Sequence, residues 1–348
     1  MKKINAKIIA DSKNIQGDRV TTMLLTYPRF IHGELLTHRM FSKNSASSRA
    51  IPFNKMVEMV IEDPFIPIAW QKDHKGMQGT EYWIDDDTVT VDEGDEYERY
   101  TKIYSATEHF ITEWLEARDL AIAQSYELNR LGVTKQLCNR LLEPFMWHTV
   151  LLTATEFENF FELRCPKYKL FGLAGNYVRS KKEWLEKMQF SSALHPSQYP
   201  QTIEDWLKID YSQAEIHMQA LAEAMWDAMN ESTPKELKSG EWHIPFGDRL
   251  TSFDFGDRQI KENLLNLKIK ISTARCARLS YMTFDGIIDY EKDIKLHDKL
   301  LESKHFSPFE HCALCVTTEE YNENFKGKEK GWFRNFKGFK SYRQILEE

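Results

Sequence analysis

The segment THRMFSKNSASSRAIP, residues 37 to 52, gathers side chains that could bind an anion. Its donors and cations are Arg39, Ser42, Asn44, Ser47, Ser48 and Arg49. A guanidinium group carries a fork of N–H donors that suits a phosphate or the carbonyl edge of a pyrimidine. The chain has no Walker sequence and no GxGxxG after an expected strand, so side chains would have to hold a phosphate. The segment predicts an anion-binding loop, with a polar turn-forming loop as the alternative.

The five cysteines are Cys138, Cys165, Cys276, Cys312 and Cys315. Their odd number and wide spacing indicate reduced thiols rather than a secreted disulfide framework. Cys312 and Cys315 are three apart on an expected strand and would point to opposite faces, and no second CxxC exists to complete a zinc site. Cys165 has no neighbouring histidine to activate it, so we expect no catalytic thiolate and no metal.

Composition limits the classes of protein that fit. A chain of 348 residues with 42% hydrophobic content can bury a substantial core. The sequence shows neither a signal peptide nor a long apolar span, so we expect a cytoplasmic protein. A net charge of -7 argues against broad attraction to nucleic acid or to an anionic membrane. Any bound anion must therefore be met by a local cluster of cations.

The periodicity of apolar residues predicts the elements that position these side chains. Strands are expected at 3–10 and 19–28, and strand-like alternation extends over 267–281. Helices are expected at 30–41, 96–131, 134–142, 153–164, 211–229 and 289–303. Residues 305–319 should turn from a loop into a strand. Residues 230–262, rich in Lys, Gly, Pro and Asp, are expected to form a linker or an exposed loop.

The segment HRMFSKNSASSR closely resembles the signature of flavin-dependent thymidylate synthases, which reads RHR, seven residues, Ser, one residue and Arg. Thr37 replaces the first Arg, whereas His38, Arg39, Ser47 and Arg49 match. NRLLEPFMWHTVLLTATEFENFFELR, residues 139–164, resembles the family segment that runs from an Arg before a Leu-Pro step to Asn-Phe-x-x-Leu-Arg. SQAEIH then follows, as Ala-Gln-x-Glu-Ile-Arg does in the family.

ARCARLSY and KHFSPFEHCALCV resemble the family's opening third, but they lie near the C-terminal end of this chain. The chain therefore resembles a circularly permuted member of the family. Permutation is physically reasonable because domain termini often lie close together at the surface.

The resemblance implies a role for each matching residue. The residues implied to contact FAD are His38, Arg39, Asn44, Asn159, His305 and Ser307. Ser47 and Arg49 would hold the nucleotide, and Arg140 would meet its phosphate. Arg164 would act at the pyrimidine edge, where a guanidinium can stabilise the anion left when N3 loses its proton. Arg164 could instead be a surface arginine at a helix C-terminus, and Asn159 a solvent-facing helix residue.

The implied reaction is reductive methylation of dUMP to dTMP, with FAD as cofactor and with methylenetetrahydrofolate and NADPH as co-substrates. Several positions depart from the family pattern: Glu34 stands for Gln, Ser45 for Glu, Glu143 for Leu and His217 for Arg. Glu34 and Ser45 are expected near the substrate, and exchanging an amide for a carboxylate changes which base edge is accepted. Hydroxymethylation of dUMP, and methylation or hydroxymethylation of dCMP, are therefore alternatives.

The run NFKGKEKGWFRNFKGFKSYR, residues 324–343, interleaves basic and aromatic residues, as single-stranded nucleic-acid-binding proteins do. The net charge and the lack of a known RNA-binding module argue against that function. A basic flap over an anionic nucleotide or a folate tail is the simpler interpretation.

The sequence thus predicts a single α+β catalytic domain with a flavin-dependent thymidylate synthase-like fold, a mixed sheet flanked by helices, and a permuted order. Its expected parts are 1–60 (signature half), 61–95 (insertion), 96–229 (helical part), 230–267 (joining loop), 268–320 (permuted N-terminal segment) and 321–348 (basic aromatic tail). Residues 1–60 and 268–320 are expected to build the sheet. The resemblance also implies a homotetramer with active sites at subunit interfaces.

Overall fold

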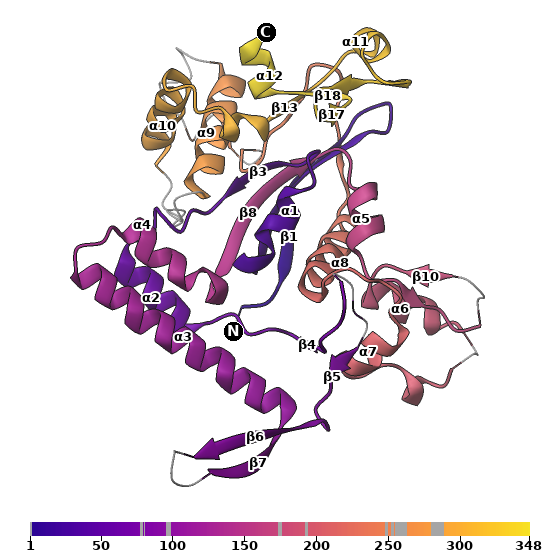
Figure 1. The fold of residues 1–348 in the computed structure, drawn as a ribbon. Helices are drawn as coiled ribbons and strands as arrows, with labels where there is room; N and C mark the ends of the chain where they lie inside the picture. The colour runs from indigo at the N-terminus through magenta and orange to yellow at the C-terminus, as the bar shows by residue number, and fades with distance from the viewer. Residues whose placement is uncertain are drawn as a thin grey trace.

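The computed structural model describes residues 2–76, 79, 81–94, 99–172, 176–191, 194–247, 250–251, 254, 263–279 and 289–348. The fold is mixed α+β, with a twisted central sheet and groups of helices around it (Figure 1). No helix in the described part of the chain is both long and apolar enough to cross a membrane.

The central sheet has the order β11-β1-β2-β8-β3. Its strands are β1 (Asn5–Lys13), β2 (Arg19–Pro28), β3 (Ser42–Ser45), β8 (Trp147–Ala154) and β11 (Lys235–Glu236). β11 runs parallel to β1 and every other neighbouring pair is antiparallel, so the sheet is mixed. Both expected N-terminal strands are confirmed. Their β-branched and apolar residues suit a pleated surface that is covered on both faces.

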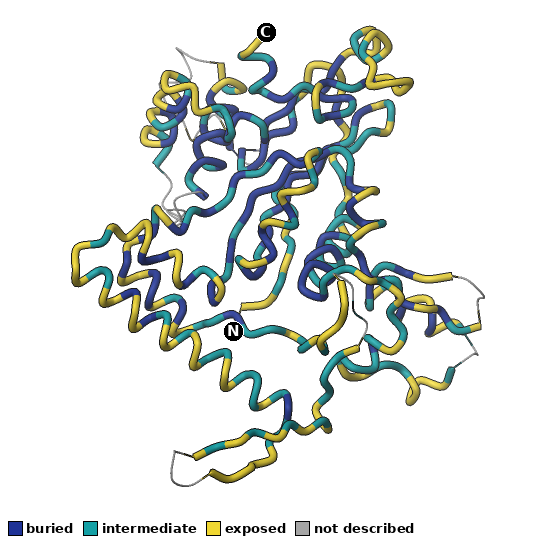
Figure 2. The backbone as a smooth tube through the Cα atoms, viewed as in Figure 1, coloured by how far each residue is buried: buried dark blue, intermediate teal, exposed yellow. Residues whose placement is uncertain are grey.

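The two faces of the sheet pack against different helices. Val150 and Leu152 join the core formed with α1 (His32–Leu36), α5 (Glu158–Arg164) and α8 (Ile216–Glu231). Leu151 points to the opposite face and packs on Cys276 of α9 (Leu264–Arg278). Figure 2 shows the resulting buried centre of the molecule. Burial on both faces explains why Val150, Leu151 and Leu152 follow one another in β8 without a polar residue between them.

An arm of helices extends from the sheet to one side (Figure 1). It contains α2 (Phe53–Glu62), α3 (Ala106–Arg130), α4 (Lys135–Cys138) and η2 (Asn139–Phe145), whereas η1 (Arg29–Ile31) connects β2 to α1. Val57 of α2 and Ile122 of α3 share one buried cluster. The short strands β4 (Trp70–Gln71) and β5 (Tyr82–Trp83) follow α2, and the hairpin of β6 (Thr88–Gly94) and β7 (Arg99–Ser105) leads into α3.

A small unit with Trp184 buried at its centre precedes α8. It consists of β9 (Tyr168–Lys169), β10 (Tyr177–Val178), α6 (Lys181–Met188), η3 (Pro196–Gln198) and α7 (Ile203–Ile209).

The C-terminal part forms a second sheet of β12 (Trp242–His243), β13 (Ala313–Cys315) and β18 (Phe339–Ser341). The helices of this part are α9, α10 (Tyr290–Glu302), η7 (Ser307–Glu310), α11 (Thr318–Glu323) and α12 (Tyr342–Glu347). Two small hairpins lie between α11 and β18: β14 (Phe325–Lys326) with β15 (Glu329–Lys330), and β16 (Trp332–Phe333) with β17 (Phe336–Lys337). The expected helix at 289–303 and the loop-to-strand change at 305–319 are confirmed.

The expectation of a strand over 267–281 is wrong, because residues 264–278 form helix α9. Leu267 and Ile271 pack in one cluster, Ile269 in a second and Cys276 in a third. A helix enclosed on several sides carries apolar residues on more than one face, which imitates strand alternation. Ser280 and Tyr281 of the expected strand lie outside the described residues.

The central sheet takes β1, β2 and β3 from residues 1–60 as expected, but none of its strands comes from 268–320, and β8, which lies between β2 and β3, comes from the part assigned to helices. The helix expected over 153–164 begins only at Glu158. Residues 99–105 form β7 rather than the start of the long helix, and Tyr100 and Ile103 are exposed. Of the expected joining loop, residues 248–249, 252–253 and 255–262 lie outside the described residues.

A buried chain of hydrogen bonds joins the two sheets. Ser12 Oγ meets His243 Nδ1 at 2.9 Å, and His243 Nε2 meets Thr22 Oγ1 at 2.8 Å. Thr22 Oγ1 lies 2.7 Å from Thr153 Oγ1, which lies 2.8 Å from His311 Nδ1. Burial lowers the pKa of His243 to about 4, and burial with the nearby His243 lowers the pKa of His311 to about 3. Both imidazoles are therefore neutral in the folded protein at pH 7.

Acid should destabilise the protein through this pair. The unfolded chain binds protons at these histidines below about pH 6.5, whereas the folded chain does not until about pH 4 to 3. Their contribution is complete above pH 6.5 and decreases as the pH falls, by about 1.4 kcal/mol per pH unit for each histidine. We expect the free energy of unfolding, measured with urea, to fall less steeply between pH 7.5 and pH 4.5 in His243→Gln than in the wild type. Substitution of the exposed His195 by Gln is the control, and equal slopes in all three proteins would contradict the prediction.

Candidate functional site

Alternate residues of the signature segment contact different parts of the molecule. His38 follows α1 and meets Arg164 at the end of α5. Ser42 and Asn44 lie on the buried face of β3, which pairs with β8 in the register Ser42↔Thr153 and Asn44↔Leu151. The alternation of a strand thus points Asn44 toward the C-terminal part of the chain.

The first cluster is built around Arg164, in the last turn of α5. Its Nε–H donates to His38 Nε2 over 3.3 Å, and its Nη1 lies 3.6 Å from Glu34 Oε2. The His38 ring meets the Phe160 ring edge to face, with their centroids 4.8 Å apart. Arg164 therefore lies at a helix C-terminus, and its side chain also contacts two residues that the signature half of the sequence singled out.

A cavity of about 690 Å³ lies beside this cluster. Its lining residues are Glu34, Glu162, Leu163, Arg164, Lys167, Tyr211, Ser212, Gln213, Ala214 and Glu215. The SQAEIH motif thus lines the cavity together with the residues before it. Its last residue, His217, is buried between Phe30 and Phe65 and accepts from the Ile68 N–H over 3.0 Å. The imidazole of His217 therefore has a packing role.

The ionisable groups of this cluster are shifted by burial and by each other. Burial raises the pKa of Glu34, the nearby Glu215 raises it further, and Arg164 opposes both. Burial, with Arg164 and Lys43, lowers the pKa of His38 to about 4. The neutral imidazole can then accept the Arg164 hydrogen bond through Nε2.

Sequence reasoning did not single out Lys43, whose ammonium donates to the carbonyls of His38 and Leu35 over 2.9 and 3.3 Å. Burial lowers the pKa of Lys43 to about 8. The strand alternation of 42–45 is the signal that could have placed this side chain on the face opposite Asn44.

The second cluster joins the signature to the permuted segment. Ser307 Oγ, at the start of η7, donates to Asn44 Oδ1. The Asn44 amide group lies 3.5 Å from the carbonyl oxygen of Cys276 in α9. Asn44 and Ser307, both predicted as flavin contacts, therefore meet although they are 263 positions apart in sequence.

The 139–143 segment supports the Ser47–Arg49 turn. Asn139 donates to the carbonyls of Ser48 and Ile51 over 2.7 and 3.0 Å. The Ser48 hydroxyl donates to Glu143, which also lies 3.6 Å from the Arg29 guanidinium. Glu143, which departs from the family pattern, thus has a structural function here. Ser45, a second departure, pairs with Val150 in the sheet.

The other six predicted site residues are exposed or only partly buried: Arg39, Ser47, Arg49, Arg140, Asn159 and His305. Within the described ranges, no carboxylate is within ion-pair distance of Arg39, Arg49 or Arg140. No contact found in those ranges connects Arg49 or Arg140 to Arg164. One chain therefore brings together Glu34, His38 and Arg164, and separately Asn44 and Ser307.

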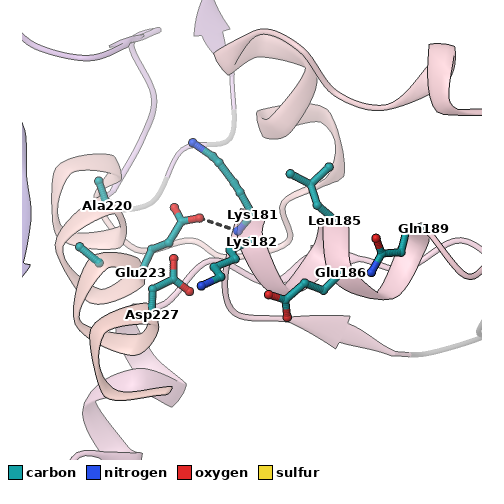
Figure 3. A pocket seen from close by; sticks show the side chains of 9 residues that line it. Lys181, Lys182, Leu185, Glu186, Gln189, Ala220, Glu223 and Asp227 are labelled. Carbon is teal, nitrogen blue, oxygen red and sulfur yellow. Dashed lines mark hydrogen bonds between the residues drawn. The ribbon is translucent and has the colours of Figure 1, made fainter. Parts of the chain in front are cut away.

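A second cavity, of about 580 Å³, lies between α6 and α8 (Figure 3). Lys181, Lys182, Glu223 and Asp227 are among its lining residues, and none of the predicted site residues is. Glu223 accepts from the Lys181 backbone N–H over 2.6 Å, and burial raises the pKa of Glu223 and of Asp227. This cavity contains none of the signature chemistry.

All five cysteines are buried free thiols. Burial raises the pKa of Cys165, so this thiol is protonated at neutral pH and is a weak nucleophile. Among the residues that the structure describes, no three His, Cys, Asp or Glu side chains are grouped to hold a metal ion.

A scan against models of known protein families found no match, and neither did a search of curated proteins. Among solved structures, this chain is similar to the UMP/dUMP methylase PolB from Streptomyces cacaoi bound with 5-Br UMP, at 13% identity and a TM-score of 0.37. That similarity covers 66% of this chain and 90% of the other. The same methylase bound with 5-Br dUMP gives 12% identity and a TM-score of 0.38, over 66% and 91% of the two chains. The two proteins are thus distant in both sequence and backbone geometry.

Proposed function

We propose that this chain is a flavin-dependent methylase of a pyrimidine deoxynucleotide, which converts dUMP to dTMP with methylenetetrahydrofolate and NADPH. The convergence of separate motifs supports the proposal. His38 meets Arg164 across 126 positions of sequence, and Asn44 meets Ser307 across 263. Each contact joins a residue of the signature to a residue of another motif of the same family pattern.

The residues present fit a flavin. The Asn44 amide and the Ser307 hydroxyl are already joined from two segments, His38, Arg39 and His305 are further polar side chains on these segments, and Asn159 lies on α5. These residues would hold FAD through hydrogen bonds, as the family resemblance implies. When bound, reduced FAD would supply the hydride of the reductive methylation.

The chain's own contribution is charge and position at the base. The Arg164 guanidinium would stabilise negative charge that develops at N3 of a pyrimidine. The neutral His38 imidazole accepts from Arg164 Nε and thereby fixes the plane of the guanidinium. Phe160, packed against His38, keeps water from one side of this pair.

We further propose that the fold has flavin-dependent thymidylate synthase topology in permuted order, as a single catalytic domain that assembles into a homotetramer. Arg49 and Arg140 are exposed and separate from Arg164 within one chain. In a tetramer, arginines from neighbouring subunits could complete one nucleotide site. Ser47 and Arg49 would then bind the nucleotide and Arg140 its phosphate.

A second candidate substrate is dCMP, with methyl or hydroxymethyl as the transferred group. The observation that favours it is the Glu34 carboxylate, 3.6 Å from Arg164. A carboxylate accepts hydrogen bonds, and the exocyclic amino group of cytosine donates them, whereas O4 of uracil does not. With Glu34 facing the amino group, Arg164 could donate to N3 of cytosine.

Product analysis tests the proposed function directly. The protein is purified with FAD and incubated anaerobically with methylenetetrahydrofolate, NADPH and either dUMP or dCMP, and the nucleotide product is weighed by mass spectrometry. We expect a methyl group on dUMP. A preference for dCMP would select the second candidate, a hydroxymethyl group on dUMP would select hydroxymethylation of that nucleotide, and bound flavin without any product would refute all three.

Removal of the Arg164 guanidinium should slow the chemical step. We expect Arg164→Ala to lower kcat by roughly 100-fold or more, because charge at the base would lose its stabilising partner. Arg130→Ala is the control, since it removes an exposed arginine whose ion pair is with Glu127. A kcat within a few-fold of wild type, with the flavin spectrum and thermal stability unchanged, would show that Arg164 is not catalytic.

Glu34 should determine the preferred base. Because an amide can donate to O4 of uracil, we expect Glu34→Gln to raise the ratio of kcat/KM for dUMP over dCMP by roughly tenfold or more. Glu162→Gln, which changes another carboxylate of the same cavity, is the matched control. An unchanged ratio in Glu34→Gln would exclude this residue from base selection.

A further inference from the structure

The hairpin of β14 and β15, residues 325–330, carries three lysines beside the signature segment and is called the basic hairpin below. Its sequence, FKGKEK, belongs to the basic aromatic tail. The proposed chemistry at Arg164 and Asn44 assigns no role to these lysines. The tail includes β17 and β18 and lies at the same end of the molecule as helix α11 (Figure 1).

Three contacts place this hairpin and the following segment against the site. Lys326 Nζ lies 3.2 Å from Met40 Sδ, in the signature itself. Asn335 Nδ2 donates to Ser42 Oγ over 2.8 Å, and the Lys337 N–H donates to Thr155 Oγ1 over 2.8 Å. Along the signature, His38 therefore faces Arg164, Met40 faces the basic hairpin, Ser42 faces Asn335, and Asn44 faces Ser307. Lys326 therefore lies beside the signature, next to Met40, between the residue that contacts Arg164 and the one that contacts Ser307.

The shape of the basic hairpin spreads its charges around its end. Phe325 pairs with Lys330 and Lys326 with Glu329, so these pairs project from opposite faces. Gly327 has φ of +64° and makes the tight turn possible, and this places Lys328 at the tip. Lys326 rests on the Trp332 ring, with Nζ 4.3 Å from its centroid. Every residue from 325 to 330 is exposed.

The hairpin itself has an excess of positive charge, with three lysines against one carboxylate, and the acidic helix α11 contacts β15. The hairpin's carboxylate, Glu329, accepts from Trp332 Nε1 over 3.0 Å and lies 3.6 Å from Lys337 Nζ. In the part of the chain that the structure describes, no carboxylate comes within ion-pair distance of Lys326, Lys328 or Lys330. On a protein with a net charge of -7, three such lysines on one exposed hairpin form a local site for anions.

We propose that the basic hairpin binds a chain of carboxylates attached to the one-carbon donor, namely the oligo-γ-glutamyl tail of a reduced folate. This inference rests on the proposed function, because it places the pterin end of that donor at the site beside Met40. The tail would leave the site along the signature, pass Lys326, and reach Lys328 and Lys330 at the exposed end. The hairpin would thereby make the protein prefer donors with long tails.

The type of cation favours carboxylates on a flexible chain. An ammonium on a four-carbon stem is a mobile point charge, which can follow separate carboxylates without a fixed geometry. The planar forks suited to phosphate are the exposed arginines Arg39, Arg49 and Arg140.

Nucleic acid fits the basic hairpin less well, because few aromatic rings are free for bases to stack on. Trp332 lies between Lys326 and Lys337, and Phe325 is the only exposed large hydrophobic residue found between 321 and 348 within the described ranges.

Binding affinity tests this proposal without turnover. Folic acid with one glutamate and folic acid with five glutamates are titrated by calorimetry into the full chain, with FAD and dUMP present and then without them. We expect the long tail to bind roughly tenfold tighter than the short one to the wild type, with a preference that weakens as salt rises. The triple variant K326Q/K328Q/K330Q should lose that preference and keep its affinity for the short form.

The control K182Q/K187Q/K208Q removes three lysines from α6 and α7 and should keep the preference. The variant K328E/K330E leaves the Lys326–Trp332 contact in place, and it should also lose the preference while its thermal stability is unchanged. Equal affinity of the wild type for both folates, or a preference kept by K326Q/K328Q/K330Q, would overturn the proposal. Tighter binding of a thymidine oligonucleotide that depends on the same lysines would overturn it in favour of nucleic acid.

Free penta-γ-glutamate separates failure of this proposal from failure of the proposed function. If it binds the wild type and not K326Q/K328Q/K330Q, while neither nucleotide is methylated, the hairpin site stands and the proposed function fails. If dUMP is methylated equally well with short-tailed and long-tailed donors, the proposed function stands and the hairpin proposal fails.

Discussion

The buried hydrogen bonds that run from Ser12 through His243, Thr22 and Thr153 to His311 hold the two halves of the molecule in place. Thr153 is central, because it is the register partner of Thr22 on one side and of Ser42 on the other. His311 lies just beyond η7, which begins at Ser307. One polar chain therefore fixes the strand that carries Asn44 relative to the turn that carries Ser307. Since a buried unsatisfied polar group costs about 1–3 kcal/mol, breaking any link would disfavour this arrangement strongly.

The site follows from that constraint and from the pleat of β3. Ser42 and Asn44 project to the buried side, where they contact the C-terminal part of the chain. His38 lies before the strand and meets α5 instead. The signature thus has two ends, one at the cavity beside Arg164, where we propose that the base binds, and one at the proposed flavin contacts. A fixed strand between them sets the separation of the two ends, which a flexible loop could not do.

Local sequence patterns predicted some elements well and others badly, for physical reasons that particular residues show. The strands at 5–13 and 19–28 and the helix at 290–302 have one dominant periodicity, and the structure confirms them. Residues 147–154 and 264–278 are buried on several sides, so their apolar residues follow neither period cleanly. Pairs such as Asn44 with Ser307 depend on the assembled sheet and could be expected only from the family pattern. The contact of Lys326 with Met40 had no sequence signal beyond composition.

Electrostatics divides the cations near the signature into two kinds. Arg164 is half-buried, has Glu34 as a counter-ion and hydrogen-bonds with a neutral histidine, so its orientation is set before any ligand arrives. Preorganised charge of this kind is effective where charge develops during a reaction. Arg39, Arg49, Lys328 and Lys330 are exposed, and no carboxylate pairs with them in the described ranges. Exposed cations lose little hydration when they meet a phosphate or a carboxylate, and they serve better for capture than for catalysis. The proposed function would use both kinds of cation, and the signature segment lies between Arg164 and the exposed cations.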